Sequence, residues 1–257
     1  MGDLNNFNVN KLGNLSVGLK RFPSTLDDLA SLKSSLDHLE IMALPNSNYA
    51  LLESLDIPIK IHCPHIAQGF NPCNLSALEK NEDLLNFSLD LADKFDSGVV
   101  VVHPGHIVNA EDSEDFAVDF FNSKIDRRFR FENLQSKDGS FSDFDKFKSF
   151  LAKLKHKKIC FDVGHAVLSS KYNGVNPLSH VSKFFSLEPD YFHLSGINLS
   201  LFKDHLNMSE NNFDYSGLVP FFPRNKVITL ETNHLTVKGE LNTRVQIDDL
   251  GFVRKLF

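Results

Sequence analysis

Short apolar stretches of this chain repeatedly end in a residue type that can bind a metal ion. The residues at six such ends are His62, His103, Glu132, Asp162, His193 and Glu231. Charged side chains at the ends of otherwise apolar stretches are costly to bury without a partner. If these ends meet, their carboxylates repel one another unless they are protonated or neutralised. A bound divalent cation removes that repulsion, so the sequence predicts a metal site.

Further histidines follow these ends at short spacing. His165 lies three residues after Asp162, and His205 lies in the stretch after the His193 end. His65 and His106 add a second imidazole after two of the other ends, and could orient a ligand, face a substrate or have a plain loop role. Any one of these histidines could instead be a hydrogen-bonded structural residue, and a single glutamate could simply pair with a lysine or arginine. It is the whole set that favours metal binding.

The apolar stretches have the length and composition of buried strands. They are Leu15–Leu19, Leu39–Ala43, Ile57–His62, Gly98–His103, Arg128–Glu132, Ile159–Asp162, Tyr191–Leu194 and Val227–Glu231. Most are continuously apolar rather than alternating, which is typical of parallel strands that are covered on both faces.

Helical patterns lie between these stretches. We expect helices at Thr25–Leu36, Asn74–Lys94, Glu111–Phe121, Ser142–Leu154, Leu178–Phe185, Tyr215–Phe222 and near Asp248–Phe257. Strand and helix alternate about eight times, which predicts an α/β protein, a (β/α)8 TIM barrel formed as a single domain by residues 1–257. An open doubly wound sheet is the alternative, but no GxGxxG or GxxxxGK[ST] motif follows the first stretch. The carboxyl ends of barrel strands build active sites, so the barrel would bring the candidate ligands together.

Composition limits the partners and the compartment. The formal net charge is −6, and no long run of Lys or Arg is present, which counts modestly against a nucleic-acid ligand. Three cysteines without a CxxC pair, together with a polar stretch at Met1–Asn10, favour a reducing cytoplasm. No apolar run approaches the ~20 residues of a membrane span, so we expect no membrane partner. The oligomeric state stays open.

The ordered series of motifs resembles a known superfamily, the xylose-isomerase-like TIM barrels, which include endonuclease IV and the sugar isomerases and epimerases. The resemblance runs from about Leu15 to Thr232 and rests on IHCPH, VVHPGH, FEN, CFDVGH, FHLSG, DHLNMSENNFDY and TLET, in that order. Each motif is short and weak alone, whereas the ordered series is specific. The resemblance implies a divalent metal, with zinc or manganese expected first and magnesium or cobalt as alternatives.

The endonuclease IV branch implies a site for three zinc ions. Carried over by motif, the ligands of one zinc are His62, His103 and Glu132, and those of the second are Glu132, Asp162, His193 and Glu231. The third zinc would be held by His165 and His205 with an aspartate two residues before His205, where this chain has Lys203. Asp204 would start from a different direction. We therefore expect the third site to be empty, or filled by water or by Lys203 itself.

The epimerase branch implies less. One metal ion, often manganese, would be held by Glu132, Asp162, His193 and Glu231. Glu132 and Glu231 would move a proton as base and acid beside a ketose carbonyl, with His165 binding a substrate oxygen. The branch's usual acidic or amide residue after the histidine is absent, because the chain reads His193-Leu-Ser-Gly. The substrate contacts are therefore not carried over.

These implications order the hypotheses. The first is a metal-dependent isomerase or epimerase of a small sugar or sugar phosphate. The second is an abasic-site DNA phosphodiesterase of the endonuclease IV type, with every ligand position filled except that of Lys203. Against it stand Lys203, the acidic charge and the lack of an intercalating aromatic other than Phe70 near His62. The third is a non-catalytic metal-binding or sugar-binding barrel.

Overall fold

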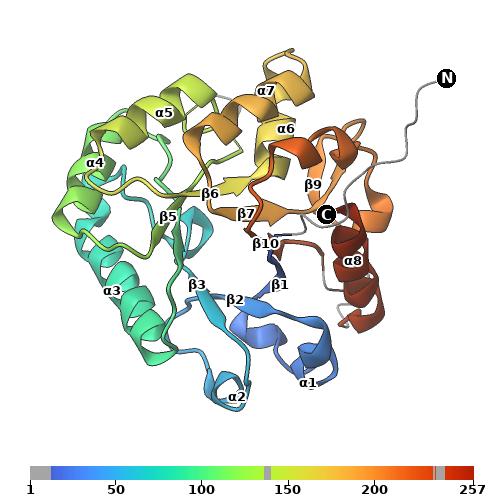
Figure 1. The fold of residues 1–257 in the computed structure, drawn as a ribbon. Coiled ribbons are helices and arrows are strands. Elements are labelled where there is room, and N and C mark those ends of the chain that lie inside the picture. The colour runs from blue at the N-terminus through green and yellow to red at the C-terminus, as the bar shows by residue number, and fades with distance from the viewer. Residues whose placement is uncertain (1–12, 136–139, 234, 236–240) are drawn as a thin grey trace.

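The structure is a computed structural model, and it describes residues 13–135, 140–233, 235 and 241–257. Its centre is a closed barrel of parallel strands in the order β1-β10-β7-β6-β5-β4-β3-β2. The strands are β1 (Leu15–Arg21), β2 (His38–Met42), β3 (Ile59–His62), β4 (Val100–Val102), β5 (Phe129–Glu132), β6 (Ile159–Asp162), β7 (Tyr191–Leu194) and β10 (Lys226–Leu230). The predicted TIM barrel is confirmed, with a strand at each predicted apolar stretch (Figure 1).

Helices form the outer ring around this barrel (Figure 1). They are α1 (Leu29–Leu32), α2 (Ala50–Glu53), α3 (Leu78–Lys94), α4 (Glu114–Ser123), α5 (Phe144–Lys153), α6 (Val163–Tyr172), α7 (Pro177–Phe184) and α8 (Thr243–Leu256). No helix in the described ranges is long and apolar enough to cross a membrane. Many of the phenylalanines, scattered along the sequence, meet between the barrel and helices α4, α5 and α7. For example, Phe121 packs edge-on against Phe131 at 4.8 Å between ring centroids.

Two predicted helices are wrong. The segment Thr25–Leu36 is not one helix, because Thr25 bonds its hydroxyl back to the Phe22 carbonyl and ends a 3-10 turn instead of capping a helix. The segment Tyr215–Phe222 forms the 3-10 turns Tyr215–Gly217 and Val219–Phe221, interrupted around Gly217 and Pro220. Both breaks come from local turn chemistry that overrides the apolar spacing.

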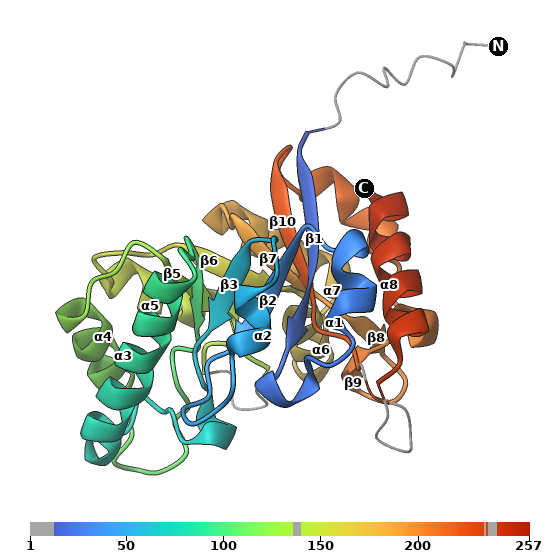
Figure 2. The same cartoon turned by 90° about the horizontal axis from the view of Figure 1, so that it is seen from below.

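Two elements were missed by the sequence patterns. Helix α6 begins directly after β6, with Asp162 as its N-cap. After β7 the chain forms an antiparallel hairpin of β8 (Gly196–Asn198) and β9 (Lys203–Leu206), outside the barrel. In Figure 2 this hairpin lies at the end of the barrel opposite the start of β1. Both elements lie at the carboxyl ends of the strands, where they can position side chains.

A buried aspartate on α8 gives the fold a testable pH dependence. Asp249 is 2% exposed, its Oδ1 accepts the Met208 N–H at 2.9 Å, and burial raises the pKa of this carboxyl to about 6. A carboxyl whose folded-state pKa is raised contributes fully below its unfolded pKa of about 3.9 and loses that contribution as the pH rises through about 6. We expect the Tm of Asp249→Asn, relative to wild type, to rise by about 2–4 °C between pH 4 and pH 8, about 1 kcal/mol after allowing for solvent screening.

The measurement is thermal unfolding in chelator at both pH values. Asp248→Asn is the matched control, because Asp248 is 61% exposed on the same helix. Equal Tm differences at pH 4 and pH 8 for Asp249→Asn would contradict the assignment.

Candidate metal centre

The structure brings all six strand-end residues to one mouth of the barrel. His62, Glu132, Asp162 and His193 are the last or next-to-last residues of β3, β5, β6 and β7, while His103 and Glu231 follow β4 and β10 directly. Two groups of ligand atoms result, each with all of its atoms within 4.8 Å of one another. They are His62, His103 and Glu132, and then Glu132, Asp162, His193 and Glu231. This placement supports the assigned ligand roles, which stay predictions.

Glu132 belongs to both groups and lies at their centre. It is fully buried, and its Oε2 lies 3.1 Å from His62 Nε2 and 3.0 Å from His103 Nε2. Its Oε1 lies 3.3 Å from His193 Nδ1. Burial alone would raise the pKa of this carboxyl, but the imidazoles of His193 and His103 hold it well below the usual range. Glu132 is therefore an ionised carboxylate surrounded by nitrogen donors.

Asp162 offers an oxygen that has no protein partner among the described residues. Its Oδ1 accepts the His165 N–H at 2.6 Å as the N-cap of α6, while Oδ2 is buried and unpaired. Burial, with the neighbouring Glu132 and Glu231 carboxylates, raises the pKa of Asp162 to about 6. Burial disfavours the charged form of His165, but the Asp162 and Glu132 carboxylates raise its pKa to about 9. A buried carboxylate oxygen without a donor fits a site that takes a cation.

A third group of ligand atoms forms where α6 meets the β8–β9 hairpin. It consists of His165, Asp204 and His205, again within 4.8 Å of one another, and Asp204 Oδ2 is buried and unpaired among the described residues. His165 Nε2 lies 3.4 Å from His205 Nε2. Gly164 permits this approach, because a Cβ there would lie only 3.4 Å from Asp204 Cβ. The chain therefore holds three candidate ligand groups side by side.

The expectation for Lys203 is wrong. Lys203 is exposed, and Asp204 rather than Lys203 faces His165. In a regular strand Asp204 and His205 would point to opposite faces. Here the β8–β9 pairing is irregular, and Phe202 and His205 have positive φ of 52° each, so neighbouring side chains can face the same site. The aspartate missing from its motif position is replaced by the next residue.

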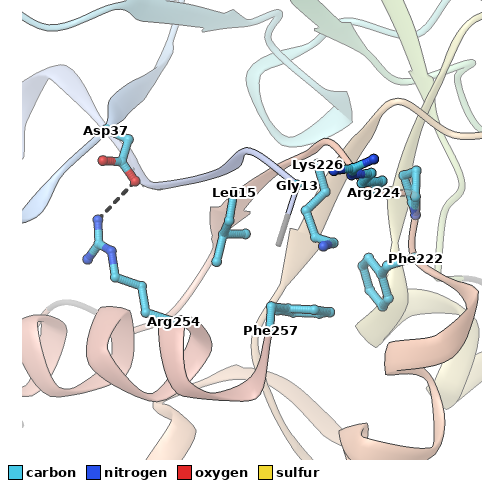
Figure 3. A pocket seen from close by; sticks show the side chains of 9 residues that line it. Gly13, Leu15, Asp37, Phe222, Arg224, Lys226, Arg254 and Phe257 are labelled. Atoms are coloured by element: carbon cyan, nitrogen blue, oxygen red, sulfur yellow. Dashed lines mark hydrogen bonds and ion pairs between the residues drawn. The ribbon is translucent and has the colours of Figure 1, made fainter. Parts of the chain in front are cut away.

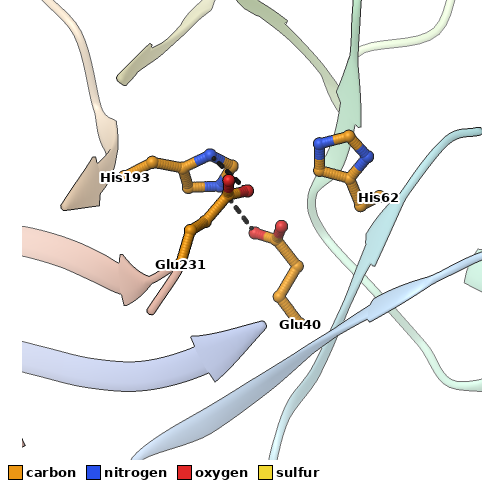
Figure 4. Close-up of side chains that lie close together, drawn as sticks. All are labelled: Glu40, His62, His193 and Glu231. Atoms are coloured by element: carbon orange, nitrogen blue, oxygen red, sulfur yellow. Dashed lines mark hydrogen bonds and ion pairs between the residues drawn. The ribbon is translucent and has the colours of Figure 1, made fainter. Parts of the chain in front are cut away.

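Two charged residues of the mouth were missed in the sequence because only the ends of the last six predicted strands were considered. Lys20, near the end of β1, donates a hydrogen bond to Glu231. Glu40, in the middle of β2, is fully buried and lies 3.0 Å from His193 Nε2. Figure 4 shows Glu40, His62, His193 and Glu231 pointing toward one another. A charged residue inside the otherwise apolar LEIMA stretch was the available signal for Glu40.

Two cavities open on this centre. One of about 450 Å³ and one of about 220 Å³ are both lined by Lys20, His65, His205 and Glu231. His106 lines only the smaller one. Burial, with the adjacent His103 and His62, lowers the pKa of His65 to about 3, so its imidazole is neutral. Together the cavities place a small molecule, or one group of a larger one, beside the ligand groups.

A larger cavity of about 660 Å³ lies at the other end of the barrel, between the starts of β1 and β10 and the end of α8 (Figure 3). It is lined by Leu15, Lys226, Arg254 and Phe257, among others, and Arg254 is already paired with Asp37 at 3.0 Å. None of the metal-ligand candidates lines it. Size alone therefore does not identify the functional cavity.

Comparisons with known proteins support the fold. No family model matches the chain. An uncharacterized protein of Methanocaldococcus jannaschii, MJ1614, is 22% identical over 227 residues, which cover 80% of this chain and 85% of that protein.

Solved structures of similar fold cover almost the whole chain. A D-tagatose 3-epimerase-like protein has a TM-score of 0.67 at 17% identity, covering 94% of this chain and 96% of its own. Endonuclease IV from Thermus thermophilus has a TM-score of 0.64 at 18% identity, covering 94% and 98%. A xylose isomerase-like TIM barrel protein from Mycobacterium smegmatis, in complex with magnesium, has a TM-score of 0.60 at 13% identity, covering 95% and 96%. The chain therefore has the fold of the xylose-isomerase-like TIM barrels, as the ordered motifs predict.

Proposed function

We propose that this chain holds a cluster of divalent metal ions and hydrolyses a phosphate ester. The observation that supports this is the contiguous arrangement of three ligand groups, joined through Glu132 and through the neighbours Asp162 and His165. A single-metal isomerase needs only one of these groups. Nothing in such a reaction would require His62, His103, Asp204 and His205 to be gathered beside it.

The residues would divide the work as follows. His62, His103 and Glu132 would hold one ion, Glu132, Asp162, His193 and Glu231 a second, and His165, Asp204 and His205 a third. Such ions, when bound, neutralise the charge of a phosphate group and acidify a water molecule. Lys20 and the neutral His65 line the cavity beside Glu231, where they can bind the oxygens of an anionic substrate. The net charge of −6 disfavours long DNA, so abasic-site DNA and small phosphate esters are both substrates to test.

An isomerase or epimerase of a small sugar or sugar phosphate is the second candidate. The specific support is the Glu132, Asp162, His193 and Glu231 group beside a cavity of about 450 Å³. Against it, Lys20 is paired with Glu231. Burial raises the pKa of this carboxyl, but Lys20 and His193 hold it well below its usual range. A carboxylate held ionised in this way is a poor proton-transfer group near neutral pH.

The deciding experiment combines an ion count with parallel assays. Crystals grown without chelator are analysed by anomalous scattering, and the same protein is assayed on abasic duplex DNA, on bis(p-nitrophenyl) phosphate and for solvent-deuterium exchange into ketoses. We expect an ion at each of the three ligand groups and chelator-sensitive phosphate-ester hydrolysis. One ion at Glu132, Asp162, His193 and Glu231 together with ketose exchange would replace this proposal by the second candidate.

Lys20 has opposite expected effects on metal and on substrate. Its ammonium occupies the Glu231 carboxylate that a metal ion would share, so Lys20→Met is expected to strengthen metal binding by about tenfold, or about 1.4 kcal/mol. The same change removes a positive charge from the cavity wall and is expected to raise KM for an anionic substrate. Zinc titration against a chromophoric chelator and steady-state kinetics measure the two effects. The control is Lys33→Met, on the outside of the barrel, and weaker metal binding by Lys20→Met would contradict the argument.

A further inference from the structure

Glu40 is a buried carboxylate that the proposed ligand groups do not use. It points inward from β2, is fully buried, and its Oε2 accepts the Tyr191 hydroxyl at 2.7 Å and faces His193 Nε2 at 3.0 Å. Its Oε1 is buried without a partner among the described residues. Glu40 thus touches a proposed ligand from the side away from the other carboxylates (Figure 4).

The two ring nitrogens of His193 face different partners. Nδ1 lies 3.3 Å from Glu132 Oε1 and 3.1 Å from Glu231 Oε1, which belong to the second ligand group. Nε2 faces Glu40. A carboxylate can only accept, so Nε2 carries a proton, and a neutral His193 then presents the lone pair of Nδ1 toward Glu132 and Glu231.

We infer that Glu40 is a positioning residue for the metal centre: by binding the Nε2 proton of His193 it directs Nδ1 at the ion that Glu132 and Glu231 share. This inference rests on the metal cluster of the proposed function, but not on the reaction that the cluster performs. A carboxylate bonded to a ligand histidine fixes the orientation of the ring and makes it a better donor, and loss of such a partner typically weakens metal binding by about 10–100-fold.

A chain of buried hydrogen bonds fixes Glu40 itself. The Tyr191 hydroxyl lies 2.6 Å from Thr229 Oγ1, and Thr229 lies 2.9 Å from His38 Nε2. His38 Nδ1 is in turn 2.9 Å from Ser16 Oγ. Burial lowers the pKa of His38 to about 4, so this ring is neutral and can accept with one nitrogen while it donates with the other. The chain joins β1, β2, β7 and β10 inside the barrel and leaves Glu40 little freedom to move.

Glu40 could itself bind an ion, because its carboxylate lies within 4.8 Å of ligand atoms of His62, His193 and Glu231. That role competes with the positioning role. The Nε2 proton that Glu40 accepts from His193 occupies the lone pair that an ion between the two would need. The positioning role keeps both contacts that the structure shows, so we argue for it, and an ion on Glu40 is an outcome that the test can reveal.

The test compares Glu40→Gln, which keeps an acceptor without charge, with Glu40→Met, which keeps the size without an acceptor. Zinc affinity is measured by competition with a chromophoric chelator. We expect Glu40→Met to weaken one zinc by about 10–100-fold and Glu40→Gln by about threefold or less. The control is Tyr191→Phe, which removes the other contact of Glu40 and leaves its bond to His193, and which should stay near wild type.

A spectroscopic measurement separates positioning from a general structural effect. In zinc-loaded protein, a long-range ¹H–¹⁵N spectrum should show a downfield, slowly exchanging Nε2 proton of His193, assigned with His193→Gln. It should move upfield in Glu40→Gln and be lost in Glu40→Met. If Glu40→Met does not fold, the shift in Glu40→Gln decides.

Three results would overturn the inference. They are wild-type zinc affinity in folded Glu40→Met, an unshifted Nε2 proton in Glu40→Gln, and anomalous density for an ion bound by Glu40. Absence of phosphate-ester hydrolysis in the wild type would instead count against the proposed function. It would leave the affinity and the spectrum, and therefore this inference, intact.

Discussion

Replacing Glu132 by glutamine is expected to abolish most metal binding and to lower chelator-sensitive hydrolysis by at least about 1000-fold. Glu132 is the residue shared by two ligand groups, and its buried carboxylate faces His62, His103 and His193. The amide removes the negative charge and places an NH2 group where a nitrogen ligand or an ion should be, so two ions lose a ligand at once. A loss of several kcal/mol of charge stabilisation corresponds to about three factors of ten in rate.

The measurements are metal content by mass spectrometry, the zinc-induced rise in Tm, and turnover. A ligand that binds only the folded state raises Tm, so the rise should shrink in Glu132→Gln. Glu79→Gln is the control, since it makes the same chemical change on the exposed side of α3. Wild-type metal content in Glu132→Gln would refute the shared-ligand assignment.

Removing Asp204 is expected to cost one metal ion, whereas changes at Lys203 next to it should cost none. Asp204 lies with His165 and His205 in the third ligand group, and its side chain is 10% exposed, while Lys203 points to solvent. Asp204→Ala leaves two neutral imidazoles, which bind a divalent ion far more weakly than a set with a carboxylate. We expect the ion count to fall by one and hydrolysis to fall by about 100-fold or more, a loss of about 3 kcal/mol or more.

Lys203→Ala and Lys203→Asp form the matched comparison, because they alter the neighbouring position of the same short strand. Both should keep the wild-type ion count and near wild-type activity. A gain of an ion in Lys203→Asp, with no loss in Asp204→Ala, would mean that residue 203 and not residue 204 faces His165 in solution. Ion counts from anomalous scattering distinguish the two arrangements directly.

Local sequence determined the barrel and the positions of the strand-end residues. An apolar stretch such as Gly98–His103 has no stable place except between layers, so its length and its polar end predict both the strand and the place where the strand ends. Repetition of that pattern predicts parallel strands whose carboxyl ends share one mouth. The order of the residues along the chain is therefore enough to assign His62, Glu132, Asp162 and His193 to one place.

Tertiary structure decided what those residues touch. Glu40 pairs with His193 across 153 residues of sequence, and Lys20 pairs with Glu231 across 211, so no local pattern could predict either contact. The direction of Asp204 depends on the irregular pairing of β8 with β9 and on positive φ angles, which a two-residue alternation does not anticipate. Strand positions follow from local burial, but the partners of a buried charge are set by whichever distant strands the closed barrel places beside it.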